Sequence, residues 1–181
     1  MTAKIILLTA ALSAAAANAP TMQMLGQTFT LADFNQKAAP MWEFTSNGES
    51  VDNWTRLVTV LERPDANTRE HLDRLAQGIM DTYKSRNGKV LMAKTMPDPK
   101  GVPYNYIIVA FDEPAKKRYE LNFVKIALGA KAAYVIVYGA RVTDAKDYTA
   151  KSKAFLSEKS GEIGMALAAA PAPDTARLPR R

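Results

Sequence analysis

The residue types that most enzymes use for chemistry are scarce in this chain. Its 181 residues include one histidine, His71, and no cysteine. A Ser-His-Asp triad would have to use His71, but the chain has no G-x-S-x-G motif and His71 falls within an expected helix. Disulfides and cysteine-ligated metals are excluded, and no calcium-loop pattern is present. The sequence therefore favours a protein that is not an enzyme and that uses no metal or other cofactor.

Paired carboxylates are the one catalytic arrangement that the sequence leaves open. Glu43 and Glu49 flank a turn, and Asp112 and Glu113 are neighbours. In linear order these are typical of solvated turn and strand residues, but carboxylates distant in sequence can converge as a glycosidase-like pair. Neither the S-x-x-K spacing of a Ser-Lys dyad nor the clustered glycines of a phosphate loop is present. A hydrolase with a carboxylate pair therefore stays an alternative.

The two tryptophans are the first candidates for binding. Residues 41–60 read MWEFTSNGESVDNWTRLVTV, with Trp42 before an Asn-Gly turn and Trp54 after it. Aromatic side chains dominate both protein cores and interfaces. We interpret the pair either as core beneath a helix or as an aromatic patch for a partner. The same choice between core and binding patch applies to five tyrosines of the later strands: Tyr104, Tyr106, Tyr119, Tyr134 and Tyr138. A curved sheet under a helix can leave a cleft for a small apolar ligand.

A proline-rich loop is the second candidate. Pro97, Pro99 and Pro103 fall within seven residues and predict a stiff, exposed connection between two strands. Such a loop is either a rigid connector or a preorganised contact that loses little entropy on binding.

A basic run, Lys116, Lys117 and Arg118, is the third candidate. It would form an anion-facing patch if the fold gathers it at one end of the sheet with Lys84, Arg86 and Lys89. Otherwise these residues are the solvated ends of helices and strands.

The N-terminal sequence predicts export. Lys4, an apolar run over residues 5–17 and the Ala17-Asn18-Ala19 pattern are typical of a cleaved signal peptide, residues 1–19. No later segment is apolar enough to span a membrane. We therefore expect a periplasmic or secreted protein. Its net charge of +6 would draw it to an anionic envelope component or an acidic envelope protein, and nucleic acid is not an expected partner.

The hydrophobic pattern predicts one α+β domain over residues 41–167. Residues 20–40 are expected to form an N-terminal arm or a short strand, and the Ala/Pro-rich basic residues 168–181 a disordered tail. Alternation predicts strands near residues 41–45 and 54–61, and an apolar stripe at helical spacing predicts a helix from residue 67 to 87. Four strands and a second helix follow: residues 90–95, 104–111, 119–126, 132–140 and 143–166. The expected fold is a mostly antiparallel sheet of five to six strands flanked by two helices.

This order of elements resembles the Mog1/PsbP-like fold, and the W-E-F-x-x-x-G-E-S…N-W-T-R-L-V-T-V pattern is similar to small exported bacterial proteins of unassigned function. The resemblance covers about residues 41–166 and implies a scaffold for protein partners. It implies no functional residue.

Three functions remain open from the sequence. The first is a non-enzymatic envelope binding protein that uses the tryptophans, the proline loop and the basic run. The second is a carrier of a small apolar ligand on the aromatic face of the sheet, and the third is an envelope hydrolase. A filled sheet face with an exposed basic end would favour the first.

Overall fold

A computed structural model describes residues 19–36, 39–143 and 146–180. Almost all of the predicted signal peptide therefore lies outside the described residues. The strands are β1 (Thr21–Met24), β2 (Gln27–Asn35), β3 (Met41–Ser46), β4 (Arg56–Arg63), β5 (Lys89–Pro97), β6 (Pro103–Glu113), β7 (Arg118–Leu128) and β8 (Ala133–Thr143). The helices are α2 (Arg69–Ser85), α3 (Tyr148–Ala169) and the short 3-10 turns η1 (Pro114–Lys116) and η2 (Thr175–Arg177).

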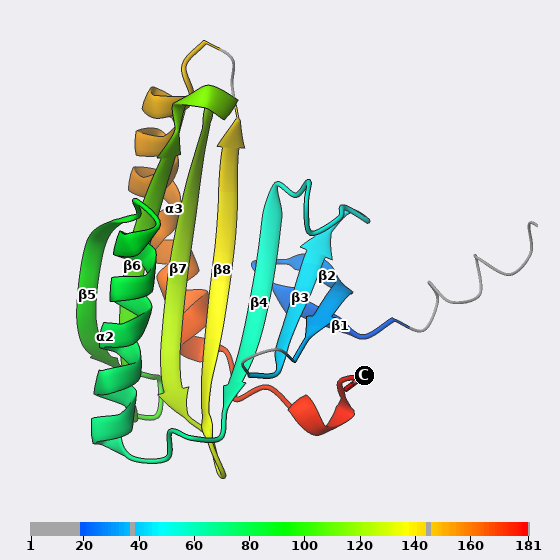
Figure 1. Cartoon of the computed structure of the whole chain (residues 1–181), viewed down its shortest axis with the longest axis vertical. Helices are drawn as coiled ribbons and strands as arrows, with labels where there is room; N and C mark the ends of the chain where they lie inside the picture. The colour runs from blue at the N-terminus through cyan, green and yellow to red at the C-terminus, as the bar shows by residue number, and fades with distance from the viewer. Residues whose placement is uncertain (1–18, 37–38, 144–145, 181) are drawn as a thin grey trace, which may run out of the picture.

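The strands form one antiparallel sheet in the order β1-β2-β3-β4-β8-β7-β6-β5 (Figure 1). The α+β class is confirmed, but the prediction of five to six strands is wrong because the described sheet has eight. Its β1–β2 hairpin turns at Leu25 and Gly26, which both have positive φ angles. A β-bulge between Leu31 and Asp33 shifts the register of β2 against β3, so the strict alternation that reveals a strand is lost.

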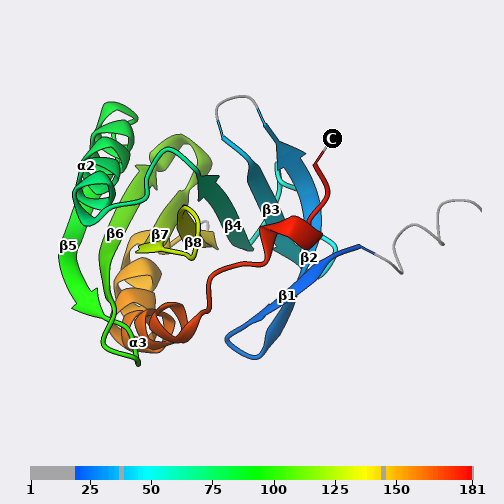
Figure 2. The same cartoon turned by 90° about the horizontal axis from the view of Figure 1, so that it is seen from below.

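The two helices pack on opposite faces of the sheet (Figure 2). We call these the α2 face and the α3 face. α3 packs on β7 and β8, and its Ile163 and Leu167 are buried there with Phe123 and Tyr138. The opposite face holds a smaller core beneath α2, which packs on β5, β6 and β7. Because strand side chains alternate between faces, β4 to β8 supply residues to both cores, whereas β1 to β3 supply residues only to the core on the α3 face.

Local interactions at its two ends determine where α2 begins and ends. Thr68, one residue after the expected cap, accepts a hydrogen bond from the backbone nitrogen of His71 at 3.2 Å. At the other end, Asn87 has a φ of 63° and the Gly88 nitrogen donates to the Tyr83 carbonyl at 2.8 Å. A Cβ on Gly88 would lie 2.8 Å from the Phe111 ring, so glycine permits the close approach of this turn to β6.

The C-terminal segment lies against the sheet and makes specific contacts there (Figure 1). The indole nitrogen of Trp42 donates to the Pro179 carbonyl at 2.8 Å, and Arg180 pairs with Glu62. Closer to α3, the buried Lys125 amine donates to the carbonyls of Ala168 and Ala170 at 3.1 and 2.7 Å. Composition alone predicts a disordered tail here. The contacts of Trp42, Arg180 and Lys125 are long-range interactions, which composition does not reveal.

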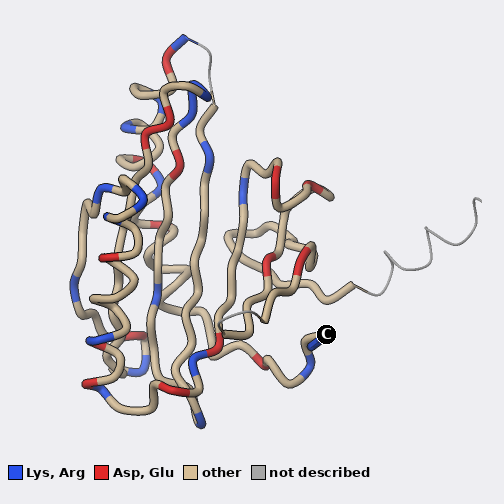
Figure 3. Tube along the Cα trace, viewed as in Figure 1, with Lys and Arg blue, Asp and Glu red and all other residues tan. Residues whose placement is uncertain are grey.

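Among the described residues, no helix combines the length and apolar character needed to cross a lipid bilayer. Acidic and basic residues both occur throughout the trace rather than separating onto two faces (Figure 3).

Candidate partner-binding groove

The α2 face is covered over only part of its width, and the uncovered part is hollow. α2 covers β5, β6 and β7, while no helix of the described residues lies over β8, β4 and β3 on this side (Figure 1). A groove of about 660 Å³ lies between α2 and the β3–β4 loop. We call it the α2-face groove. It continues into two neighbouring hollows, which share Ile79 and Thr82 at one side and Met41 and Leu61 at the other.

The floor of the groove is largely apolar. The antiparallel register places Thr59 of β4 beside Val137 of β8, which in turn pairs with Val124 of β7. Leu57 and Leu61 are two residues away from Thr59 along β4 and therefore point to the same face. Leu61 and Val137 are half-buried, whereas Leu57 and Thr59 are buried and Val124 is fully buried, so the floor presents a narrow apolar strip to the groove. No described helix lies over this strip, which leaves it open to contact with another molecule.

Trp54 forms one wall of the groove together with Arg141. Its side chain is only 6% exposed, and the Arg141 guanidinium lies over its ring at 3.8 Å from the centroid. Arg141 also pairs with Glu120 at 3.1 Å. Gly139 makes room for the indole, because a Cβ there would lie 2.9 Å from Cη2 of Trp54. The wall is therefore a fixed stack of an aromatic ring and a cation.

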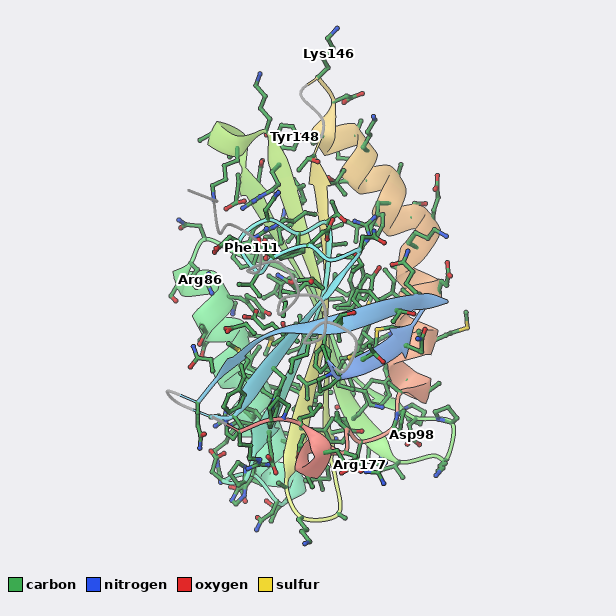
Figure 4. The ribbon with its side chains drawn as sticks, turned by 90° about the vertical axis from the view of Figure 1, so that its right-hand side faces the viewer. Arg86, Asp98, Phe111, Lys146, Tyr148 and Arg177 are labelled. Atoms are coloured by element: carbon green, nitrogen blue, oxygen red, sulfur yellow. The ribbon has the colours of Figure 1, made fainter. Side chains whose placement is uncertain are left out.

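The end of the groove nearest η1 is basic. Glu113 pairs with Arg118 and with Lys116, the latter at 3.2 Å, so one carboxylate serves two cations. Burial alone would raise the pKa of Glu113, but the hydrogen bonds from Arg118 and Lys116 outweigh it and lower the pKa. Arg86, the C-cap residue of α2, also lines this end (Figure 4), and among the described residues it forms no ion pair. This end therefore carries excess positive charge.

Two ionisable side chains of the groove are held in their neutral forms more strongly than usual. Burial, followed by the nearby charge of Glu120, raises the pKa of Tyr83 to about 12. Burial, followed by the charge of Asp33, raises the pKa of Glu43. Asp33 and Glu43 are direct partners in the β2–β3 register, so the two carboxylates repel each other.

Glu43→Gln is expected to stabilise the protein at pH 7. Because the pKa of Glu43 is raised in the folded state, the folded chain binds this proton more tightly than the unfolded chain. Stability is therefore lost as the pH rises from the unfolded pKa through the raised folded pKa, and glutamine avoids that loss. Urea denaturation of the unaltered protein and of Glu43→Gln should show a higher free energy of unfolding for the variant at pH 7. This difference should disappear below pH 4. An equal difference at both pH values would contradict this explanation.

The structure brings only some of the predicted site residues together. Trp54, Lys116 and Arg118 all line the α2-face groove. Trp42 lies on the opposite face, where it is fully buried in the core. Lys117 follows η1 in a left-handed conformation and is not among the lining residues.

The proline loop is remote from the groove. Pro97 and Pro103 face each other as the last pair of the β5–β6 hairpin, with Pro99 in the turn between them. The Asp98 carboxylate accepts hydrogen bonds from the nitrogens of Lys100 and Val102, both at 2.8 Å. In Figure 4, Asp98 lies on the α3 side of the molecule and Arg86 on the α2 side. The loop is therefore not part of the groove.

The strand predicted near residues 54–61 is present as β4, but it does not include Trp54. Trp54 precedes β4, in a loop that Glu49 closes by accepting hydrogen bonds from the backbone and hydroxyl of Thr55 at 2.9 and 2.8 Å. The loop frees the indole from the alternation of β4, so that it crosses to the α2 face.

The aromatic α3 face is mostly a filled core. Phe123 is fully buried, and Tyr104 and Tyr138 are almost so. The carboxylates that the sequence paired have separate partners. Asp112 accepts a hydrogen bond from the Tyr148 hydroxyl at 3.0 Å, and Glu113 pairs with Lys116 and Arg118. Glu49 binds Thr55, whereas Glu43 is the register partner of Asp33. Within the described ranges, no group of three or more His, Cys, Asp or Glu residues is placed to hold a metal ion.

Several groove residues give no signal in the sequence. Arg141 and Glu120 belong to strands whose other residues suggested only core, and their pairing depends on the β7–β8 register. Ile79 and Thr82 line the groove because α2 packs on β5, β6 and β7, and this placement depends on tertiary contacts. Polar residues at inward positions of otherwise apolar strands are the one signal that could have indicated this end of the groove.

Comparisons with known proteins give no independent indication of function. No protein-family model matches the chain, and no curated protein is significantly similar to it in sequence.

Proposed function

We propose that this chain is a non-enzymatic binding protein of the bacterial envelope, periplasmic or secreted, that holds a segment of another envelope protein in the α2-face groove. The observation that carries the proposal is the uncovered apolar floor with the Trp54–Arg141 wall and the basic end beside it. Export is inferred from the N-terminal sequence, and a role as a scaffold for partners agrees with the Mog1/PsbP-like resemblance.

The chemistry of the groove favours a particular kind of segment. Leu61 and Val137 offer apolar contacts along the floor, whereas Arg86 and Lys116 offer charge at one end. A partner segment with a row of apolar side chains followed by acidic residues complements both parts. A highly charged polysaccharide would leave the apolar floor without a matching surface, so a protein partner is favoured over an anionic polymer.

A charge-reversal pair tests this proposal. Residues 20–181 serve as bait in an envelope extract, and mass spectrometry identifies the retained proteins. We expect Lys116→Glu to weaken retention of a specific partner about tenfold, because it reverses the sign of charge at the basic end. Lys117→Glu, one residue away and outside the groove, makes the same change of charge and should retain the partner.

Two outcomes with Lys116→Glu and Lys117→Glu would contradict the proposal. Equal loss of the partner from both variants would show that net charge alone governs binding. Equal retention by both would exclude the basic end from the interface.

A further inference from the structure

A second hollow lies on the α3 face, where α3 crosses the edge of the sheet. Its volume is about 270 Å³, and it is lined mainly by apolar side chains. We call it the α3-face slot. It is formed by Met92, Lys94 and Met96 of β5, Tyr104 and Tyr106 of β6, and Ser160, Gly161, Gly164 and Met165 of α3, with their neighbours. It lies on the opposite face from the α2-face groove, and the inference drawn from it does not depend on the proposed function.

The slot exists because α3 presents small residues to the sheet at this point. Gly161 and Gly164 lie on the same side of the helix, and no atom lies within 4 Å of a Cβ built on Gly161. A Cβ on Gly164 would come within 3.3 Å of the Tyr106 hydroxyl. The open space is therefore next to Gly161, and the Tyr106 hydroxyl lies against the glycine wall.

The Tyr106 hydroxyl is a buried donor that has no partner within the described part of the chain. Tyr106 is only 4% exposed, and its hydroxyl has no hydrogen bond to any described residue. Native proteins rarely leave such groups unpaired, and each one requires an explanation. Burial, followed by the neighbouring Tyr104, raises the pKa of Tyr106 to about 12, so the hydroxyl keeps its proton at neutral pH. It is available to donate to an acceptor inside the slot.

Lys94 supplies a positive charge at the mouth of the slot. It faces Tyr106 directly across the β5–β6 pair, and its exposed side chain has no ion pair among the described residues. The slot thus combines a phenolic donor and an ammonium group with walls of methionine and tyrosine. Methionine side chains are flexible and polarisable, and they adapt to apolar ligands of varied shape.

We propose that the α3-face slot binds a medium-chain alkyl carboxylate, with its chain between Met92, Met96 and α3 and its carboxylate at Lys94 and Tyr106. The carboxylate accepts a hydrogen bond from the Tyr106 hydroxyl and forms an ion pair with the Lys94 ammonium group. At about 30 Å³ for each water-sized group, the slot holds roughly nine such groups. That volume suits a chain of about eight carbons.

The methionines do not favour a soft metal ion instead. Met92 and Met96 are four residues apart on an extended strand, which separates their Cα atoms by about 13 Å. This spacing suits contacts along an extended alkyl chain better than two ligands to one ion.

Isothermal titration calorimetry with octanoate tests the inference, with 1-octanol as the uncharged probe. We expect octanoate to bind the unaltered protein and octanol to bind at least tenfold more weakly. Gly161→Leu should abolish binding, because its side chain extends from a Cβ position that no atom approaches within 4 Å and occupies the slot, and leucine favours the helix. Tyr106→Phe and Lys94→Glu should each weaken binding about tenfold. Lys89→Glu, on the same strand but outside the slot, should not change it.

Three results would overturn the inference. The first is an absence of octanoate binding to the unaltered protein at millimolar concentration. The second is equal binding by Gly161→Leu, which thermal denaturation would show to be folded. The third is equal affinity for octanoate and octanol, which would exclude a carboxylate-binding role for Lys94 and Tyr106.

Discussion

Replacing Trp42 with alanine is expected to lower the free energy of unfolding by about 3–5 kcal/mol. Trp42 is fully buried on the α3 face, and its ring centroid lies 5.4 Å from that of Phe34. Alanine would leave a cavity between the strands and would also remove the hydrogen bond to the Pro179 carbonyl. The loss should therefore include the anchoring of the C-terminal segment. Urea denaturation followed by circular dichroism measures it.

Val102→Ala is the control for this result. Val102 is an apolar residue that is 47% exposed in the β5–β6 turn, and its truncation should change stability by less than about 0.5 kcal/mol. If Trp42→Ala cost as little as Val102→Ala, Trp42 would not be a core residue, and an aromatic binding patch at this position would have to be reconsidered.

Reversing the charge of Lys125, in the variant Lys125→Glu, is expected to have the second large effect. It should lower the free energy of unfolding by about 4 kcal/mol or more. Lys125 is only 2% exposed, and its amine donates to the carbonyls of Ala168 and Ala170 at the end of α3. In Lys125→Glu, a buried carboxylate would face these carbonyl oxygens at the negative end of the helix dipole. Chemical denaturation at pH 7 measures the loss.

Two variants separate the local effect from the change in net charge. Lys153→Glu makes the same change on an exposed position of α3 and should leave stability within about 0.5 kcal/mol of the original. Lys125→Met keeps most of the buried volume and should cost less than Lys125→Glu, about 1–3 kcal/mol for the unpaired carbonyls. Equal stability of Lys125→Glu and Lys153→Glu would contradict the anchoring role of Lys125.

Lys125 should also leave a signature in the pH dependence of stability. Burial lowers its pKa in the folded state, so the folded chain loses this proton at a lower pH than the unfolded chain. Between the two pKa values the unfolded state binds more protons, and this group therefore makes stability rise with pH. The rise should be missing in Lys125→Met.

The helices and the central strands could be predicted from the sequence because their signals are local. The apolar stripe of α2 and the Asn87-Gly88 stop depend on neighbouring residues alone. Residues 20–40 are expected from the sequence to form an arm or a short strand, whereas β1 and β2 form a hairpin there; the bulge after Leu31 disrupts the period of two that identifies β2 as a long strand. Local pattern therefore located the elements with regular periods and missed the irregular one.

The site was harder to predict because it depends on which face each side chain reaches. Trp42 and Trp54 are close in sequence but lie on opposite faces, since the loop before β4 changes the alternation between them. Lys125 lies within an apolar strand, and only the tertiary contact with the end of α3 explains its burial. The groove itself exists because α2 covers only β5, β6 and β7 on this face, and no short sequence pattern encodes that coverage.

Blocking the α2-face groove tests its role as the contact surface most directly. Thr82 lines the groove from α2, whereas Gln77 is exposed on the same helix outside it. We predict that Thr82→Trp, used as bait in an envelope extract, loses the partner that the unaltered protein retains, and that Gln77→Trp keeps it. Retention of the same partner by a folded Thr82→Trp variant would contradict the assignment of the groove as the binding site.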